Sequence, residues 1–380
     1  MESPVVLANE KSYESYDFQI PSIIEKAVKG HVGHVGLQFP EGFLEYGTLI
    51  ARQISQGADC DVTIMADAVF GACCVDDLAC RSMGIDLLVH FGHSCLIPVD
   101  QTVVQTMYIA VTMKFDHEHL IDTIRYNFPC ETKIALQGTI QFTNCLPLVM
   151  SALVDVGYIS VQIPRSRPLG PGETLGCTSP EITGADVLIF VADGRFHIEA
   201  AMMANPDLPA FRYDPFSCRF FSEFLSVNEL KKVREIEMKK CMHAKRVGLI
   251  LGTLGRQGSV GVLESLKELL IERNIAWVVV LLSEISPNKL NQFEKSVDCW
   301  VQVACPRLSI DWGESYNVPM LTSFEAFQIW SNNSFELESI PMDYYSNSAG
   351  PWGNYAHKTT QWKFYHMGPG KNTLAPINRA

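Results

Sequence analysis

The segment GHVGLQFPEG, at residues 33–42, has the pattern of a short buried β-strand that stops at a Pro-Glu-Gly turn. A helix-like segment, FLEYGTLIARQISQG, follows at residues 43–57. The same order recurs in KIALQGTIQF, which begins at residue 133, and in RVGLILGTLGRQG, which begins at residue 246. The recurrence predicts three similar α/β units, although few residues are identical between them.

Each unit offers two further apolar runs. They lie at residues 60–74 and 85–95, at 158–164 and 185–197, and at 275–287 and 299–310. Strands buried on both faces that alternate with helices are typical of parallel sheets covered by helices. We therefore expect three α/β domains with parallel sheets about a pseudo-threefold axis. The predicted segments are an extension at 1–24, domains at 25–125, 126–240 and 241–340, and a wrapping or partly disordered extension at 341–380. A helix at residues 222–245 is expected to link the second and third units.

The composition favours a globular protein. Hydrophobic residues make up 47% of the chain and charged residues 19%, and the net charge of -12 argues against binding to a phosphate backbone. Neither a secretory signal nor an apolar run of the roughly 20 residues needed to cross a bilayer is visible, which predicts a cytoplasmic protein. Because the cytosol keeps thiols reduced, we expect most of the 12 cysteines to be buried apolar residues.

One cysteine-bearing loop in each unit departs from that expectation. The loops contain Cys73 and Cys74, Cys177, and Cys305, each beside glycine, alanine or proline. Ligands of open α/β sheets bind beyond the carboxyl ends of the strands, where three such loops can meet. Three thiolates leave one iron of a four-iron cluster open to substrate, whereas four would complete its ligation. A single cysteine taken alone is more often a buried apolar residue, and the CxxC pairs of zinc ribbons are absent.

Motifs in and around these loops closely resemble the diphthamide biosynthesis protein one family, the eukaryotic subunit one of 2-(3-amino-3-carboxypropyl)histidine synthase. They include GACCVDDLACRSMGIDLLVHFGHSCLIP, LGCTSP, DGRFHIEA, LGTLGRQG, LLSEISPNKL and VQVACPRLSIDWG. The likeness spans about residues 16–358. The resemblance implies a [4Fe–4S] cluster held by Cys73, Cys177 and Cys305, with Cys74 as the alternative first ligand.

The resemblance also implies a reaction. The reduced cluster cleaves S-adenosylmethionine between the sulfonium and the γ-carbon, which releases methylthioadenosine. The resulting 3-amino-3-carboxypropyl radical adds to C2 of a histidine on translation elongation factor two. The implied partners are a homologous second subunit, forming a heterodimer, and a small iron-binding electron donor.

The glycine-rich loop after the first strand of the third unit is the candidate substrate-binding element. It comprises Gly252, Thr253, Leu254, Gly255, Arg256, Gln257 and Gly258. Free N–H groups at a helix N-terminus bind anions, and an arginine pairs with a carboxylate through two hydrogen bonds. We therefore expect this loop to hold the methionine carboxylate of S-adenosylmethionine; the alternative is a tight turn with a surface arginine.

Other polar residues near the predicted strand ends have alternative interpretations. His90, His93 and His197 are interpreted as structural histidines in preference to proton shuttles. Asp76 and Asp77 are expected to cap a helix, with tuning of the cluster as the alternative.

Two other functions remain possible from the sequence. One is a quinolinate-synthase-like enzyme, which also uses three domains and a three-cysteine cluster but condenses small molecules. The other is a scaffold subunit that carries a cluster without catalysing the reaction. The LGRQG and ACPRLSIDWG motifs favour the transferase over the first, and the presence of all three cysteines favours a catalytic subunit over the second.

Overall fold

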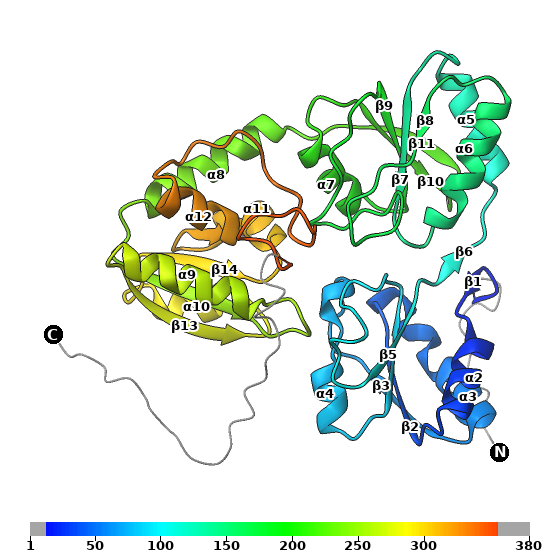
Figure 1. The fold of residues 1–380 in the computed structure, drawn as a ribbon, viewed down its shortest axis with the longest axis horizontal. Coiled ribbons are helices and arrows are strands. Elements are labelled where there is room, and N and C mark those ends of the chain that lie inside the picture. Colours follow the sequence, from blue (N-terminus) through cyan, green and yellow to red (C-terminus); the bar gives the residue numbers. More distant parts are fainter. Residues whose placement is uncertain (1–12, 356–380) are drawn as a thin grey trace.

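Three largely parallel β-sheets organise residues 13–355, the part of the chain that the computed structural model describes. The sheets and their helices form three lobes around a common centre (Figure 1). Of the two predicted extensions, residues 1–12 and 356–380 lie outside the described residues.

Every lobe repeats one strand order. The first strand of a unit lies between the second and the third, the fourth lies beyond the third, and all four are parallel. The strands are β2 (His34–Gln38), β3 (Asp61–Met65), β4 (Leu87–Phe91) and β5 (Gln105–Ile109); β7 (Ile134–Gly138), β8 (Val161–Gln162), β9 (Val187–Val191) and β10 (Ala210–Asp214); and β12 (Arg246–Gly252), β13 (Ala276–Leu282), β14 (Cys299–Val303) and β15 (Met320–Thr322). The prediction of three α/β units with parallel sheets is confirmed.

Helices cover the sheets on both faces, so most residues of the inner strands are buried. They are α2 (Ile20–Lys29), α3 (Gly47–Ala58), α4 (Asp77–Ser82), α5 (His117–Asn127), α6 (Leu146–Asp155), α7 (Phe196–Ala204), α8 (Val227–Cys241), α9 (Val260–Glu272), α10 (Pro287–Leu290), α11 (Arg307–Trp312) and α12 (Ser323–Ser331). Short 3-10 turns occupy Glu41–Tyr46, Ala72–Cys74, Thr143–Cys145, Asn291–Phe293 and Gly313–Ser315. Strands β4, β7, β9 and β14 are buried at every residue, which explains why apolar runs without alternation mark them in the sequence.

Two further pairings extend the sheets. Strands β1 (Tyr16–Asp17) and β6 (Thr112–Met113) form a small antiparallel pair, and β11 (Arg219–Glu223) pairs antiparallel with β10. The predicted helix at 222–245 is therefore shorter than expected, because its first residues belong to β11 and the helix α8 begins at Val227. A hairpin through Pro215 ends the parallel order of the second sheet.

Helix α5 packs against the second sheet. Its Leu120 and Ile124 share a group of buried residues with Ile134 and Ile189 of that sheet. The bounds predicted for the domains placed residues 117–125 in the first unit, and those bounds remain a prediction. The packing shows that the chain reaches the second core at α5.

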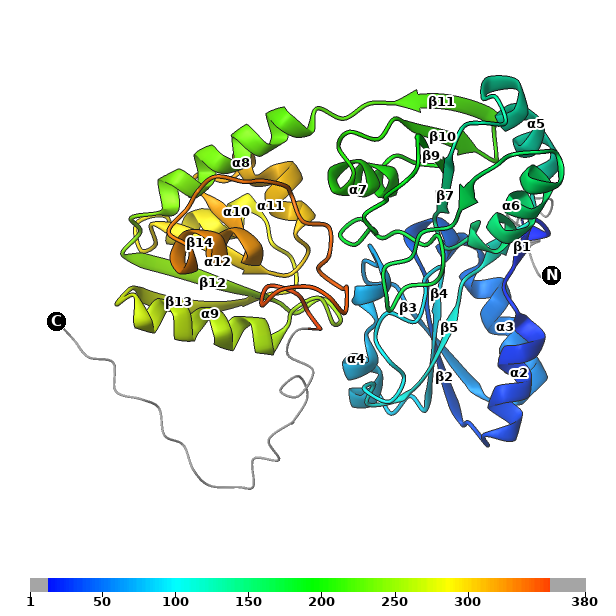
Figure 2. The ribbon, with the colours of Figure 1, turned by 45° about the horizontal axis from the view of Figure 1, so that its top comes forward.

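The chain from residue 332 to residue 355 has no helix or strand and runs from α12 back to the point where the three units meet (Figures 1 and 2). Ile340 and Met342 pack with α7 and α8 residues, and Tyr344, Tyr345 and Tyr355 enter the group of buried residues at the centre. This segment therefore covers the centre of the molecule.

Candidate functional site

Each of the three predicted cysteine loops follows a strand and points toward the centre. Cys73 lies in the 3-10 turn Ala72–Cys74 after β3, Cys177 in the loop between β8 and β9, and Cys305 directly after β14. Cys73 and Cys177 pack in the same group of mostly buried residues. The loops thus come together from segments far apart in the sequence.

Cys305 lies near enough to the other two thiols to affect their pKa values. Burial and the Cys305 thiolate raise the pKa of Cys177 to about 12. A hydrogen bond with Cys74, burial, and the thiolates of Cys74, Cys177 and Cys305 raise the pKa of Cys73. Burial raises the pKa of Tyr345 as well, and the charges of Cys73, Cys177 and Cys305 raise it further. The three thiols are therefore close enough to repel one another when ionised.

Two of these loops are each held by a glutamine of an inner strand. Gln38, the last residue of β2, donates from Nε2 to the Cys74 carbonyl at 3.0 Å and accepts from the Asp76 N–H at 3.2 Å. Gln302 of β14 donates from Nε2 to the Cys305 carbonyl at 2.9 Å. In the second unit Gln137 is fully buried, but its amide has no hydrogen-bond partner among the described residues.

Cys73 and Cys74 have different surroundings. Cys73 packs beside Cys177, and its charge is among the causes that raise the pKa of Tyr345. Cys74, in contrast, is fully buried and accepts a hydrogen bond from Gln257 Nε2 at 3.4 Å. Burial raises the pKa of Cys305, and the nearby Cys74 thiolate raises it further. Contact with Cys177 distinguishes Cys73 as the one that faces the second unit.

The glycine-rich loop at residues 252–258 packs against the first cysteine loop. The Arg256 N–H donates to the Cys73 carbonyl at 2.7 Å. Gly255 has φ +54°, and a Cβ there would lie 2.4 Å from the Cys74 carbonyl carbon, so only glycine fits. The loop leads into α9, as predicted, and Ser259 caps that helix through the Val262 N–H at 3.4 Å.

Arg256 pairs with a carboxylate of the protein itself. Its Nε and Nη2 donate to the two carboxylate oxygens of Asp77 at 2.7 and 2.5 Å, and both side chains are inaccessible to solvent. The alternative of a surface arginine is therefore wrong. Asp76, as expected, caps α4 by accepting from the Ala79 N–H at 3.2 Å, but Asp77 serves the ion pair.

The other loop residues are also engaged. The Thr253 N–H donates to the Leu282 carbonyl at 2.9 Å, and a Cβ on Gly252 would lie 2.6 Å from the Ala304 Cβ, next to Cys305. Gly258 borders a hollow that Arg256 and Tyr345 also line. The loop therefore lies between the first and third cysteine loops and beside Tyr345.

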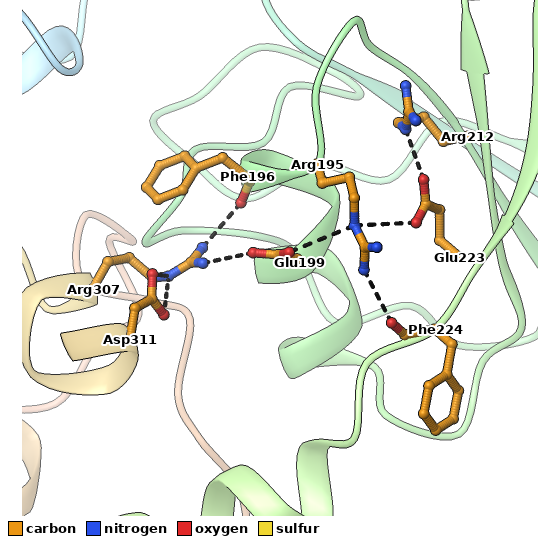
Figure 3. Close-up of polar contacts among 8 residues, drawn as sticks. All are labelled: Arg195, Phe196, Glu199, Arg212, Glu223, Phe224, Arg307 and Asp311. Carbon is orange, nitrogen blue, oxygen red and sulfur yellow. Dashed lines mark hydrogen bonds and ion pairs between the residues drawn. The ribbon is translucent and has the colours of Figure 1, made fainter. Parts of the chain in front are cut away.

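Arg307, two residues after Cys305, ties the third unit to the second cysteine loop and to helix α7. Figure 3 shows its contacts with Phe196, Glu199 and Asp311. Its Nη1 donates to the carbonyls of Gly176 at 3.3 Å and Phe196 at 2.9 Å, and its Nη2 donates to Glu199 at 2.8 Å. Asp311 accepts from Nε at 2.8 Å. A Cβ at Gly176 would lie 2.1 Å from the Phe196 ring, so any larger residue there would force that ring to move.

The contacts continue away from the cysteines through charges of alternating sign (Figure 3). Arg195 lies 3.7 Å from Glu199 and 3.2 Å from Glu223, which accepts from Arg212 at 2.8 Å. Neither Arg307 nor Tyr345 is among the functional residues predicted from the sequence. The only signal for Arg307 was its position two residues after a predicted ligand.

Burial determines the charge state of the three histidines. His90 is fully buried, and its Nδ1 lies 2.8 Å from Gln38 Oε1; because an amide oxygen only accepts, Nδ1 carries the hydrogen. Burial lowers the pKa of His90, and it lowers the pKa values of His93 and His197 to about 4. All three are therefore uncharged at neutral pH.

These thiols suit a cluster better than a single metal ion. Within residues 13–355 no three histidine, cysteine or acidic side chains converge as ligands of one ion. An iron–sulfur cluster binds each thiolate through a different iron, so its cysteines lie further apart. Mutual repulsion of three buried thiolates is relieved by a cationic iron centre, which fits the donor set.

No helix in the described part of the chain is both long and apolar enough to span a membrane.

Comparisons with known proteins agree on one family. Residues 39–341 match the family model described as putative diphthamide synthesis protein. The chain is 45% identical over 347 residues to 2-(3-amino-3-carboxypropyl)histidine synthase subunit 1 of Schizosaccharomyces pombe, covering 89% of this chain and 79% of that protein. The protein of that name from Gallus gallus is 43% identical over 353 residues, covering 92% of this chain and 85% of that one.

A solved structure shares the fold. The crystal structure of Dph2 from Pyrococcus horikoshii with a 4Fe–4S cluster aligns with a TM-score of 0.72 at 23% identity, covering 89% of this chain and 97% of that one. The likeness confirms the predicted pseudo-threefold arrangement of α/β domains.

Proposed function

The chain belongs to the diphthamide synthesis protein family, and from this premise we propose that it is the catalytic subunit for the first step of diphthamide synthesis. In this proposal it transfers the 3-amino-3-carboxypropyl group of S-adenosylmethionine to C2 of a histidine on translation elongation factor two. The observation that carries the proposal is the meeting of Cys73, Cys177 and Cys305 at the centre of the three units.

Those three cysteines are our proposed ligands of a [4Fe–4S] cluster. A reduced cluster held by these residues would supply the electron that breaks the bond between the sulfonium and the γ-carbon. Gln38 and Gln302 hold the carbonyls of two loops, and Arg307 holds the third through Gly176. The protein therefore presents its thiols from loops whose backbones are already fixed, which limits the reorganisation that binding requires.

We keep the loop at residues 252–258 as the proposed contact for S-adenosylmethionine. Its position between two cysteine loops and beside the hollow that Tyr345 lines supports this role. Because Asp77 already occupies two donors of Arg256, we assign the binding to the backbone of Gly252, Gly255 and Gly258 and to the side chains of Thr253 and Gln257. Arg256 shapes the loop.

The proposed partners are a homologous second subunit in a heterodimer, elongation factor two as the substrate, and a small iron-binding electron donor, all in the cytoplasm. The relatives' name, subunit 1, supports an assembly of more than one chain. The edge strand β13 also leaves Trp277, Val278 and Leu281 exposed. Exposed apolar residues on a strand edge are typical of surfaces that another protein covers.

Anaerobic purification with the second subunit, followed by iron and sulfide analysis and EPR after reduction, tests the proposal. We expect about four irons per catalytic chain, and methylthioadenosine release that depends on elongation factor two. Cys177→Ala should abolish both, whereas Cys130→Ala, at a half-buried cysteine of the second unit outside the site, should change neither. Quinolinate formation would indicate the alternative enzyme, and unchanged transfer by Cys177→Ala would indicate a scaffold.

A further inference from the structure

Glu173 is a buried acid with one unused oxygen. It precedes Cys177 in the same loop and is 2% exposed. Its Oε2 accepts from the Gly170 N–H at 3.0 Å, while Oε1 has no hydrogen-bond partner among residues 13–355. Within those residues no ion pair joins it to a lysine, arginine or histidine. A carboxyl group removed from water in this way requires a proton or a cation.

Ser94 of the first unit faces this carboxyl group. Burial raises the pKa of Glu173, and the Ser94 hydroxyl and the Gly170 N–H lower it. The Ser94 hydroxyl is therefore near the carboxyl group, yet its Oγ is buried and also lacks a partner within hydrogen-bond distance in the described chain. Two buried oxygens from different units thus face one another, and neither makes a hydrogen bond of ordinary geometry within the described chain. Buried polar atoms that lack partners usually mark a missing water or ligand.

These two oxygens lie beside the cysteine site. Leu175, two residues after Glu173, and Leu96, two residues after Ser94, pack with Cys73 and Cys177 in one group of largely buried residues. Glu173 itself pairs by a backbone bridge with Gly138, at the carboxyl end of β7. Ligands of such sheets bind at this end of the strands.

We propose that Glu173, together with Ser94, binds the α-ammonium group of S-adenosylmethionine. An ammonium has three donors and a positive charge, which match two unused oxygens of which one belongs to a buried carboxyl group. The sulfonium of the same molecule is cationic but carries no hydrogen to donate. This assignment rests on the proposed function and names the residue that recognises the amino-acid end of its co-substrate.

Two nucleosides test the assignment by anaerobic calorimetry on the heterodimer. S-adenosylhomocysteine keeps the α-ammonium and carboxylate, whereas methylthioadenosine lacks the whole aminocarboxypropyl group. In Glu173→Gln, which keeps an acceptor for Gly170, the dissociation constant for S-adenosylhomocysteine should rise about tenfold or more. That for methylthioadenosine should stay unchanged. Glu181→Gln, at an exposed acid of the same loop, should alter neither.

Thermal unfolding without ligand distinguishes a role of Glu173 in ligand binding from a role in the stability of the fold. If Glu173 serves the ligand, Glu173→Gln should unfold at the same or a higher temperature, because a buried acid without a cation is costly. A lower unfolding temperature with parallel loss of both nucleosides would show a structural role and overturn the assignment. Unchanged binding of S-adenosylhomocysteine would overturn it as well. Failure of the unaltered heterodimer to bind either nucleoside would instead overturn the proposed function and the assignment together.

Discussion

Arg256 and Asp77 form a doubly hydrogen-bonded ion pair in which neither side chain contacts solvent, although 179 residues separate them in the sequence. The pair joins the glycine-rich loop of the third unit to the helix that follows the first cysteine loop. Asp77 also accepts from the Val103 N–H at 2.7 Å. The first cysteine loop is therefore fixed in part by a residue of another domain.

Removal of one partner of this pair should be costly. We expect Asp77→Asn or Arg256→Met to lower the free energy of unfolding by about 3–5 kcal/mol, because each leaves a buried charge without its counterion. Denaturant titration of both single variants and of the double variant Asp77→Asn/Arg256→Met measures this. The double variant should lose much less than the sum of the singles; strict additivity would show that the two residues act independently.

Arg307→Lys should weaken the second cysteine loop while keeping the charge. Lysine lacks the planar fork that reaches Gly176, Phe196 and Glu199 together. We expect lower iron retention after reconstitution and an altered EPR line shape. Arg195→Lys is the matched control, since Arg195 lies in the same network but is half exposed and contacts no cysteine loop. Equal effects of the two substitutions would contradict a specific role for Arg307.

Cys73→Ala and Cys74→Ala should behave differently. We expect Cys73→Ala to lose most of its iron and all transferase activity, because Cys73 is the neighbour of Cys177. Cys74→Ala should keep its cluster and lose only about 1–2 kcal/mol of stability, from a small cavity and the lost contact with Gln257. Iron analysis and EPR of the two reconstituted variants decide the matter, and the reverse order of iron content would assign the ligand to Cys74.

Features that depend on neighbouring residues in the sequence can be predicted from it, whereas contacts between domains cannot. The strands and the loop positions of Cys73, Cys177 and Cys305 follow from local patterns of apolar residues and glycine. The partners of Arg256 and Arg307 do not, because they depend on how finished domains dock. Gly255 was predicted for its N–H groups, yet its φ and its closeness to Cys74 reflect packing between units. Tyr345 lies in a segment whose apolar residues show no helix or strand periodicity, so no sequence pattern predicts where its side chain lies.

Tyr345→Ala should expose the thiols to solvent. Tyr345 is buried and packs with Cys177 and Tyr355 in the central group. We expect a cluster assembled anaerobically to bleach several-fold faster in air than in the unaltered protein, because removal of the ring opens a path for oxygen. Loss of absorbance after air exposure measures the rate. Tyr126→Ala, at a ring that is 91% exposed, should bleach at the unaltered rate.

His90 should make stability depend on pH. Burial lowers its pKa in the folded protein, so the unfolded chain takes up a proton at a higher pH than the folded chain does. The stabilisation is complete above about pH 6.5 and is lost as the pH falls below that value. Thermal unfolding between pH 7.5 and 5.5 should therefore show a steeper decline for the unaltered protein than for His90→Gln. The exposed His31→Gln should follow the unaltered protein, and identical slopes for all three would contradict this role.

The irregular segment at residues 332–355 has a consequence for biosynthesis. Since Tyr344 and Tyr345 enclose thiols that lie as early as residue 73, the pocket is complete only when the chain as far as residue 345 has left the ribosome. A nascent chain halted before this point carries open cysteine loops. Maturation of the centre is thereby deferred until translation has passed residue 345.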